Sequence, residues 1–101
     1  MSARISIPKW QIEAFCRRNH IRRLALFGSV LRDDFGPESD VDVLVEFEPD
    51  AHVGFFELFD MEQELSRMLG GRKVEISTPQ SLSKYFRDEV LGEAEVQYAQ
   101  T

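Results

Sequence analysis

The sequence predicts a single α/β or α+β domain in which a small sheet is packed by helices. The chain has 101 residues, the size of one domain, and 43% of them are hydrophobic, enough for one compact core. Short apolar runs typical of strands alternate along the chain with segments of helical periodicity. No repeat or linker interrupts this alternation, so we expect residues 1–101 to form one domain.

The first helix and the first strand follow from apolar spacing. Residues 8–19 carry one apolar stripe at i, i+3 and i+4, formed by Ile12, Phe15 and Cys16, which predicts a helix. Residues 24–27 are a continuous apolar run stopped by Gly28, which predicts a buried strand. Ser29 is then placed to cap a short helix over residues 30–34.

The remaining elements are predicted in the same way. Alternating valines over residues 41–47 predict a strand with one apolar face. Residues 54–69 have helical periodicity and end at two glycines, and residues 73–77 predict a third strand. Thr78 and Pro79 then have the form of a helix start, and a final helix is expected over residues 82–92.

The helix over residues 54–69 places Phe56 nearly opposite its apolar stripe. We expect a large aromatic side chain in that position to be shielded from solvent by another part of the protein or by a partner. Either the loop of residues 48–53 covers it, or it belongs to an interface with a partner.

Charge and composition exclude several classes of protein. Residues 1–32 carry seven Lys or Arg and one Glu, a balance of +6, whereas residues 33–101 carry five bases and seventeen acids, a balance of −12. This acidity disfavours direct nucleic-acid binding and suits a cation site or a basic partner. No apolar run is long enough to cross a bilayer, and the N-terminus lacks the apolar core of a signal peptide. One cysteine cannot form an internal disulfide, so we expect a cytoplasmic protein, and one cysteine with two histidines cannot form a thiolate and imidazole zinc site alone.

The chemically informative stretch runs from residue 24 to residue 47. Gly28-Ser29 is followed by a ten-residue gap and then by Asp40-Val41-Asp42. Side chains at i and i+2 of a strand share a face, so the two carboxylates repel each other unless a cation lies between them. Oxygen ligands favour Mg²⁺ or Mn²⁺, and a Gly-Ser turn before a helix can approach a phosphate closely. The pattern therefore predicts a phosphoryl-transfer site; the alternative is a solvated acidic pair beside an ordinary turn.

The same stretch resembles the G-S-x10-D-x-D signature of the DNA polymerase β-like nucleotidyltransferase superfamily. More narrowly, residues 22–98 resemble the minimal nucleotidyltransferase (MNT) family, the antitoxin half of HEPN–MNT toxin–antitoxin pairs. The resemblance includes Arg32, Ser39 and the segment 43–47. It also includes the GRKV–I–TP pattern at residues 71–79 and the helix-like segment 85–91.

This resemblance implies an α+β fold with a small mixed sheet flanked by helices. It implies Mg²⁺-dependent transfer of AMP from ATP to a tyrosine hydroxyl of a cognate HEPN ribonuclease toxin, with this chain as the antitoxin. Carried over by position, Asp40, Asp42 and Glu75 would be the catalytic and metal-binding acids. The nucleotide-binding residues would be Gly28, Ser29, Arg32 and Ser39.

Glu75 departs from the family pattern, in which this position is usually Asp. The extra methylene displaces the carboxylate by about one bond length, whereas catalytic groups need placement within about 0.5 Å. The sequence therefore leaves two functions open. One is an active protein adenylyltransferase, and the other is an antitoxin that neutralises by binding alone with a degenerate nucleotide site.

Overall fold

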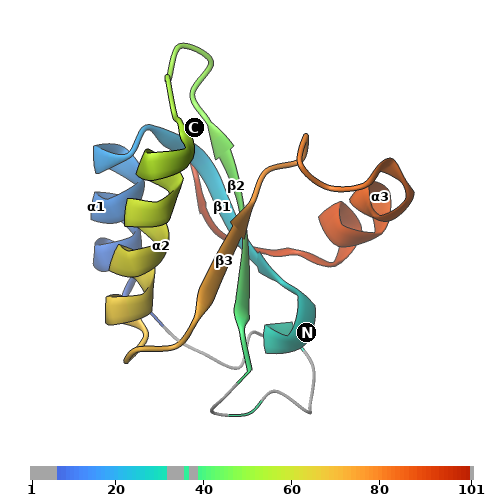
Figure 1. The fold of residues 1–101 in the computed structure, drawn as a ribbon, viewed down its shortest axis with the longest axis horizontal. Helices are drawn as coiled ribbons and strands as arrows, with labels where there is room; N and C mark the ends of the chain where they lie inside the picture. The colour runs from blue at the N-terminus through green and yellow to red at the C-terminus, as the bar shows by residue number, and fades with distance from the viewer. Residues whose placement is uncertain (1–6, 32–35, 37–38, 101) are drawn as a thin grey trace.

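The structure is a computed structural model that describes residues 7–31, 36 and 39–100. Helices pack on a four-stranded sheet, as predicted for the α+β class (Figure 1). The elements in chain order are α1 (Lys9–Arg18), β1 (Ile21–Phe27), the 3₁₀ turn η1 (Gly28–Leu31), β2 (Val41–Phe47), α2 (Phe55–Met68), β3 (Val74–Ser77), α3 (Lys84–Glu93) and β4 (Glu95–Ala99). None of the helices in this described part has the length and apolar character needed to span a bilayer.

The sheet is mixed and has the strand order β3-β2-β1-β4. β1 pairs antiparallel with both β2 and β4, whereas β2 and β3 are parallel. Within this register, Asp42 lies opposite Phe27 of β1 on one side and opposite Glu75 of β3 on the other. The sheet therefore aligns one position from each of three neighbouring strands in a single row.

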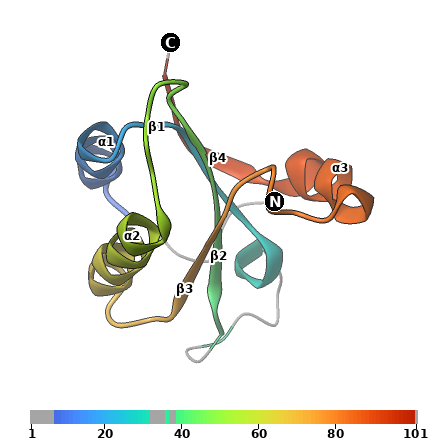
Figure 2. The same ribbon diagram turned by 45° about the horizontal axis from the view of Figure 1, so that its top comes forward.

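The two faces of the sheet have different cover. α1 and α2 lie side by side on one face, and α3 and η1 lie on the other side (Figures 1 and 2). The alternating valines of β2 point into the core beneath α1 and α2, with Val41, Val43 and Val45 at most 1% exposed. Burying each such side chain contributes about 1.5–3 kcal/mol. Because side chains alternate along a strand, this burial directs Asp42 to the opposite face.

The end of α2 agrees with the glycine signal in the sequence. Gly70 and Gly71 both have positive φ, at 75° and 93°. The N–H of Gly71 donates to the carbonyl of Ser66 at 2.8 Å, and the N–H of Gly70 donates to the carbonyl of Arg67 at 3.3 Å. These are the two hydrogen bonds of a Schellman motif, which ends the helix and directs the chain into β3.

Three local predictions were wrong. Thr78 does not begin a helix, because its backbone and side chain form reciprocal hydrogen bonds with Ser81 in a turn, and α3 begins at Lys84 behind the capping residue Ser83. Ser29 lies inside η1, so it is not a capping residue, and residues 32–34 of the helix expected after it lie outside the described residues. The strand β4 was not predicted, because it is only five residues long and follows α3 after a single residue, with no turn signal between them.

Cys16 lies in the core and is fully buried. Burial raises the pKa of its thiol from 9.0 to about 12, because the charged thiolate is poorly solvated there. Between these two values the unfolded chain binds fewer protons than the folded one, so the stability falls as pH rises from 9 towards 12. We expect denaturant unfolding to show this loss in the wild type and a smaller loss in Cys16→Ala. If the free energy of unfolding fell equally with pH in both proteins, the loss would not come from the Cys16 thiol.

Candidate functional site

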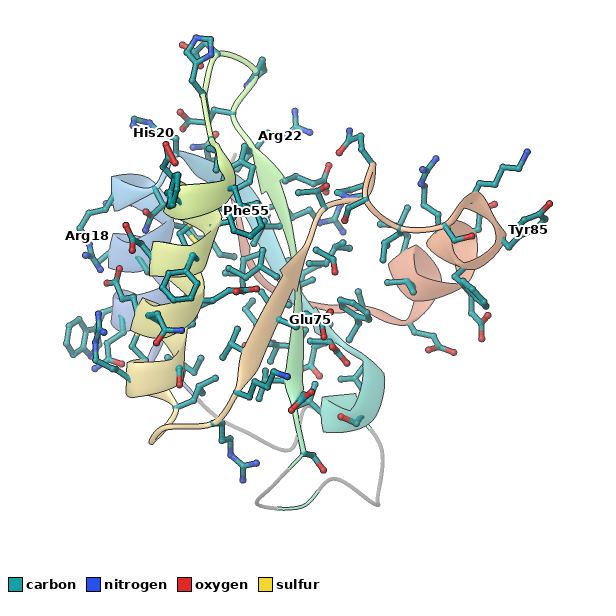
Figure 3. All side chains as sticks on the ribbon, in the orientation of Figure 1. Arg18, His20, Arg22, Phe55, Glu75 and Tyr85 are labelled. Atoms are coloured by element: carbon teal, nitrogen blue, oxygen red, sulfur yellow. The ribbon has the colours of Figure 1, made fainter. Side chains whose placement is uncertain are left out.

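The candidate site begins with the row of positions on three adjacent strands. Asp42 is the register partner of Phe27 at the end of β1 and of Glu75 in β3. Paired residues of neighbouring strands project from the same face of a sheet, so the carboxylates of Asp42 and Glu75 share the face opposite α1 and α2. Glu75 is solvent-exposed on β3 (Figure 3), and Asp42 is half-buried. Two predicted acids that are far apart in sequence are thus neighbours across the β2–β3 pair.

Gly28 closes this row at the end of β1. Its φ is +76°, a conformation that side chains other than glycine rarely adopt. A Cβ added at this position would overlap the Oδ2 atom of Asp42 and would lie 3.3 Å from its Cγ atom. The missing side chain is what lets the turn after β1 lie directly against the Asp42 carboxylate. The predicted need for glycine here therefore has two physical reasons, the backbone conformation and the space.

Asp40 is held from two sides where the chain enters β2. The hydroxyl of Ser29 donates to the backbone carbonyl of Asp40 at 3.1 Å. The next N–H, that of Val41, donates to the carbonyl of Lys73 at 2.9 Å. Ser29 thus joins the exit of β1 to the entrance of β2, and its one hydroxyl proton is used in this bond.

The segment just before Asp40 is held by a residue that sequence reasoning missed, Arg72, which precedes β3. Within this segment, the hydroxyl of Ser39 accepts from the N–H of Gly36 at 3.0 Å, and the N–H of Ser39 donates to the carbonyl of Gly36 at 3.1 Å. Nη1 of Arg72 donates to the same carbonyl at 2.8 Å, which ties this turn to the entrance of β3. The only sequence signal for Arg72 was its place in the GRKV pattern. Arg32, the arginine that the sequence did predict, lies outside the described residues.

The donor atoms of this site suit a hard divalent cation. Asp40, Asp42 and Glu75 offer carboxylate oxygens only, which is the ligand type that Mg²⁺ and Mn²⁺ prefer. Among the described residues, no group of three His, Cys, Asp or Glu side chains is assembled as a complete metal cage. Mg²⁺ is commonly bound by one or two carboxylates together with substrate phosphates and water. The residues therefore fit a metal that arrives with a nucleotide.

A surface hollow elsewhere does not coincide with these acids. It has a volume of about 600 Å³ and lies between α1 and β4, where Lys9, Glu13 and Gln97 are among its lining residues. None of the acids of the row lines it. This hollow is therefore not the candidate site. We assign the site to Asp40, Asp42 and Glu75 because of their chemistry and their positions in the sheet.

Comparisons of sequence with known proteins identify the family of the chain. The profile of the nucleotidyltransferase domain family matches residues 8–96. Two proteins of Methanocaldococcus jannaschii, each provisionally named a protein adenylyltransferase, resemble the chain. One is 36% identical over 62 residues, which are 61% of this chain and 61% of that protein. The other is 31% identical over 77 residues, which are 76% of this chain and 80% of that protein. The chain thus spans less than two thirds of the first relative's length.

Solved structures resemble the fold. A provisionally named minimal nucleotidyltransferase superposes with a TM-score of 0.70 at 30% identity, covering 85% of both chains. A toxin–antitoxin structure with AMP-PNP has a TM-score of 0.73 at 18% identity, covering 94% of this chain and 76% of that one. A Shewanella oneidensis complex of a tri-AMPylated HEPN toxin with its MNT antitoxin has a TM-score of 0.65 at 19% identity, covering 91% and 70%. At 18% and 19% identity, the two toxin–antitoxin structures show only that the fold is shared. The family profile and the 30% identical structure show that the chain belongs to the nucleotidyltransferase domain family, as one of its minimal members.

Proposed function

We propose that this chain transfers AMP from ATP to a tyrosine hydroxyl of a cognate HEPN-type toxin and so acts as its antitoxin. The observation that carries the proposal is the contact between Gly28 and the Asp42 carboxylate, with Glu75 beside it on the next strand. A backbone that accepts a phosphate, next to carboxylates that accept a divalent cation, is the arrangement that phosphoryl transfer needs.

Each site residue has a role in this proposal. Asp40 and Asp42 hold the cation, and the bare backbone of Gly28 leaves room for a phosphate group beside them. Glu75 accepts the proton of the attacking hydroxyl, whose oxygen bonds to the α-phosphorus of ATP as the α–β phosphoanhydride bond breaks and pyrophosphate leaves, and it would contribute a third oxygen ligand. A bound Mg²⁺ would supply charge neutralisation for the triphosphate. Ser29, Ser39 and Arg32 would contact the triphosphate, as the resemblance implies.

The choice of a protein acceptor is supported by the relatives and by this chain's own surface. Both archaeal relatives are provisionally named protein adenylyltransferases, and one fold neighbour is an MNT antitoxin in complex with a HEPN toxin. Three phenylalanines of α2 are exposed on a chain whose net charge is −6, which suits a protein partner with basic character. We propose the cytoplasm as the setting of this reaction.

A second candidate function is neutralisation by binding alone. Glu75 favours it, because this exposed side chain is one methylene longer than the aspartate of the family pattern. Mg²⁺ tolerates little distortion of its octahedral geometry, so a displaced third ligand would weaken catalysis before it weakened protein binding.

Nucleotide binding has a direct consequence for thermal stability. A ligand that binds only the folded state at 100 times its Kd stabilises that state by about 2.7 kcal/mol, which raises the Tm of a domain of this size by roughly 10 °C. We expect Mg²⁺ with ATP to produce such a shift in the wild type and not in Asp40→Asn/Asp42→Asn. The control is Asp50→Asn/Asp60→Asn, which changes the net charge equally at exposed positions away from the site. An undiminished shift in the double site variant would exclude these acids as ligands.

Transfer itself is tested by intact-mass spectrometry of the product of the adjacent open reading frame, the proposed HEPN-type partner, after incubation with this chain, ATP and Mg²⁺. A gain in mass by one or more AMP units supports the enzyme. A stable complex without any gain supports neutralisation by binding alone.

A further inference from the structure

α2 exposes aromatic side chains that its own fold does not use. Its apolar stripe faces the sheet, where Met61 and Leu65 are buried. Phe55, Phe56 and Phe59 lie on the remaining faces and are 82%, 80% and 53% exposed. The loop before α2 therefore does not cover Phe56. Of the two explanations that the sequence left open for this side chain, an interface with a partner remains. Clustered exposed aromatic side chains are typical of protein interaction sites.

The charges around these rings indicate what binds there. Residues 46–64 contain seven acids and no Lys or Arg. Four of these acids have partners: Glu46 pairs with Arg22, Glu48 with His20 and Glu64 with Arg18, and Glu62 accepts a backbone N–H. Glu57 and Asp60, between the phenylalanines, are exposed and form no ion pair within the described residues. A complementary surface is an apolar pocket surrounded by Lys and Arg, which excludes anionic membranes and nucleic acids.

This part of α2 borders the strand that carries Glu75. Glu62, one turn after Phe59, accepts a hydrogen bond from the N–H of Ile76 at 2.8 Å. Ile76 follows Glu75 in β3, which is an edge strand of the sheet. A protein seated over Phe59 would therefore lie beside the β3 edge of the sheet, next to the strand that carries Glu75.

We propose that Phe55, Phe56 and Phe59, with Glu57 and Asp60, form the docking surface for the protein acceptor, which meets it with an apolar pocket flanked by basic side chains. This surface is called the α2 surface below. The proposal rests on the proposed function and adds where the acceptor is held.

The helix α3 is the natural control. None of its side chains is buried, and Tyr85 and Phe86 are 83% and 59% exposed. Its charges are mixed, because two bases in its first half, Lys84 and Arg87, are followed by three acids, so they indicate no particular partner. α3 also lies on the opposite side of the sheet from α2 (Figures 1 and 3).

The test measures, by titration calorimetry, the affinity of this chain for the product of the adjacent open reading frame, the proposed HEPN-type partner. Phe55→Ser/Phe56→Ser should weaken binding by at least about 30-fold, the loss typical of interface hot spots. Tyr85→Ser/Phe86→Ser, with the same loss of aromatic surface on α3, should bind as the wild type does. Glu57→Lys/Asp60→Lys should slow association and reduce its salt dependence, whereas Asp88→Lys/Glu89→Lys should not.

Several outcomes would overturn the docking proposal. These are no binding by the wild type, unchanged affinity of the α2 variants, or a loss confined to the α3 variants. A wild-type chain that sediments as a dimer, with Phe55→Ser/Phe56→Ser monomeric, would assign the α2 surface to a second copy instead.

Docking and chemistry can fail separately. The α2 variants should keep the full Mg²⁺–ATP melting shift, and Asp42→Asn should keep full affinity for the partner. A wild type that binds through the α2 surface but never transfers AMP would leave the docking proposal intact and reject the enzymatic one.

Discussion

Gly28→Ala is expected to lower AMP transfer by 100-fold or more. The new methyl group would overlap the Oδ2 atom of Asp42, so the carboxylate or the turn must move. Displacement of a reacting group by about 1 Å can cost about 100-fold in rate. Alanine at a φ of +76° also costs about 1–2 kcal/mol of stability. The two measurements are the transfer rate to the HEPN-type protein and the free energy of unfolding in urea.

Gly70→Ala separates these two effects. Gly70 has nearly the same backbone conformation, with φ at +75°, but a Cβ added there meets nothing within 4 Å. We expect Gly70→Ala to lose a similar amount of stability and to keep its activity. If both variants lost activity in proportion to stability, the special contact between Gly28 and Asp42 would have no functional meaning.

The second large effect is expected at Glu75. Glu75→Gln keeps the shape of the side chain and removes its charge and its basicity, so transfer should fall by about 10²–10⁴-fold. Glu75→Asp restores the shorter carboxylate of the family pattern, so it should keep or raise transfer. The assay is the initial rate of AMP incorporation into the partner, under conditions where each variant is folded by circular dichroism.

Glu89→Gln is the matched control, because it makes the same chemical change at an exposed glutamate on α3, outside both the site and the proposed docking surface. Equal rates for the wild type, Glu75→Asp and Glu75→Gln would place the third acid elsewhere. If the wild type did not transfer AMP but Glu75→Asp did, the chain would be an antitoxin that acts by binding, and the extra methylene of Glu75 would be what prevents catalysis.

The local pattern of the sequence predicted the acidic strand and its glycine well. β2 spans residues 41–47 as the alternating valines indicated, because one buried face imposes a period of two. Gly28 was expected to end a strand and to lie near a ligand, and its positive φ follows from the same lack of a side chain. These features depend on neighbouring residues, which a single sequence displays.

Features that depend on residues far apart in the chain could not be predicted from local sequence patterns. The pairing of Asp42 with Glu75 requires the parallel crossover from β2 to β3, which local periodicity does not specify. Arg72 became visible only through its bond to the carbonyl of Gly36, an acceptor 36 positions earlier in the chain. The exposure of Phe56 likewise depended on whether a separate loop folded over it.

The most direct test of the account is the mass of the HEPN-type protein after incubation with this chain, ATP and Mg²⁺. We predict a gain of one or more AMP units with the wild type and none with Asp42→Asn, although Asp42→Asn still forms the complex. An unchanged mass after incubation with a wild-type chain that binds both the partner and Mg²⁺–ATP would contradict the proposed transfer.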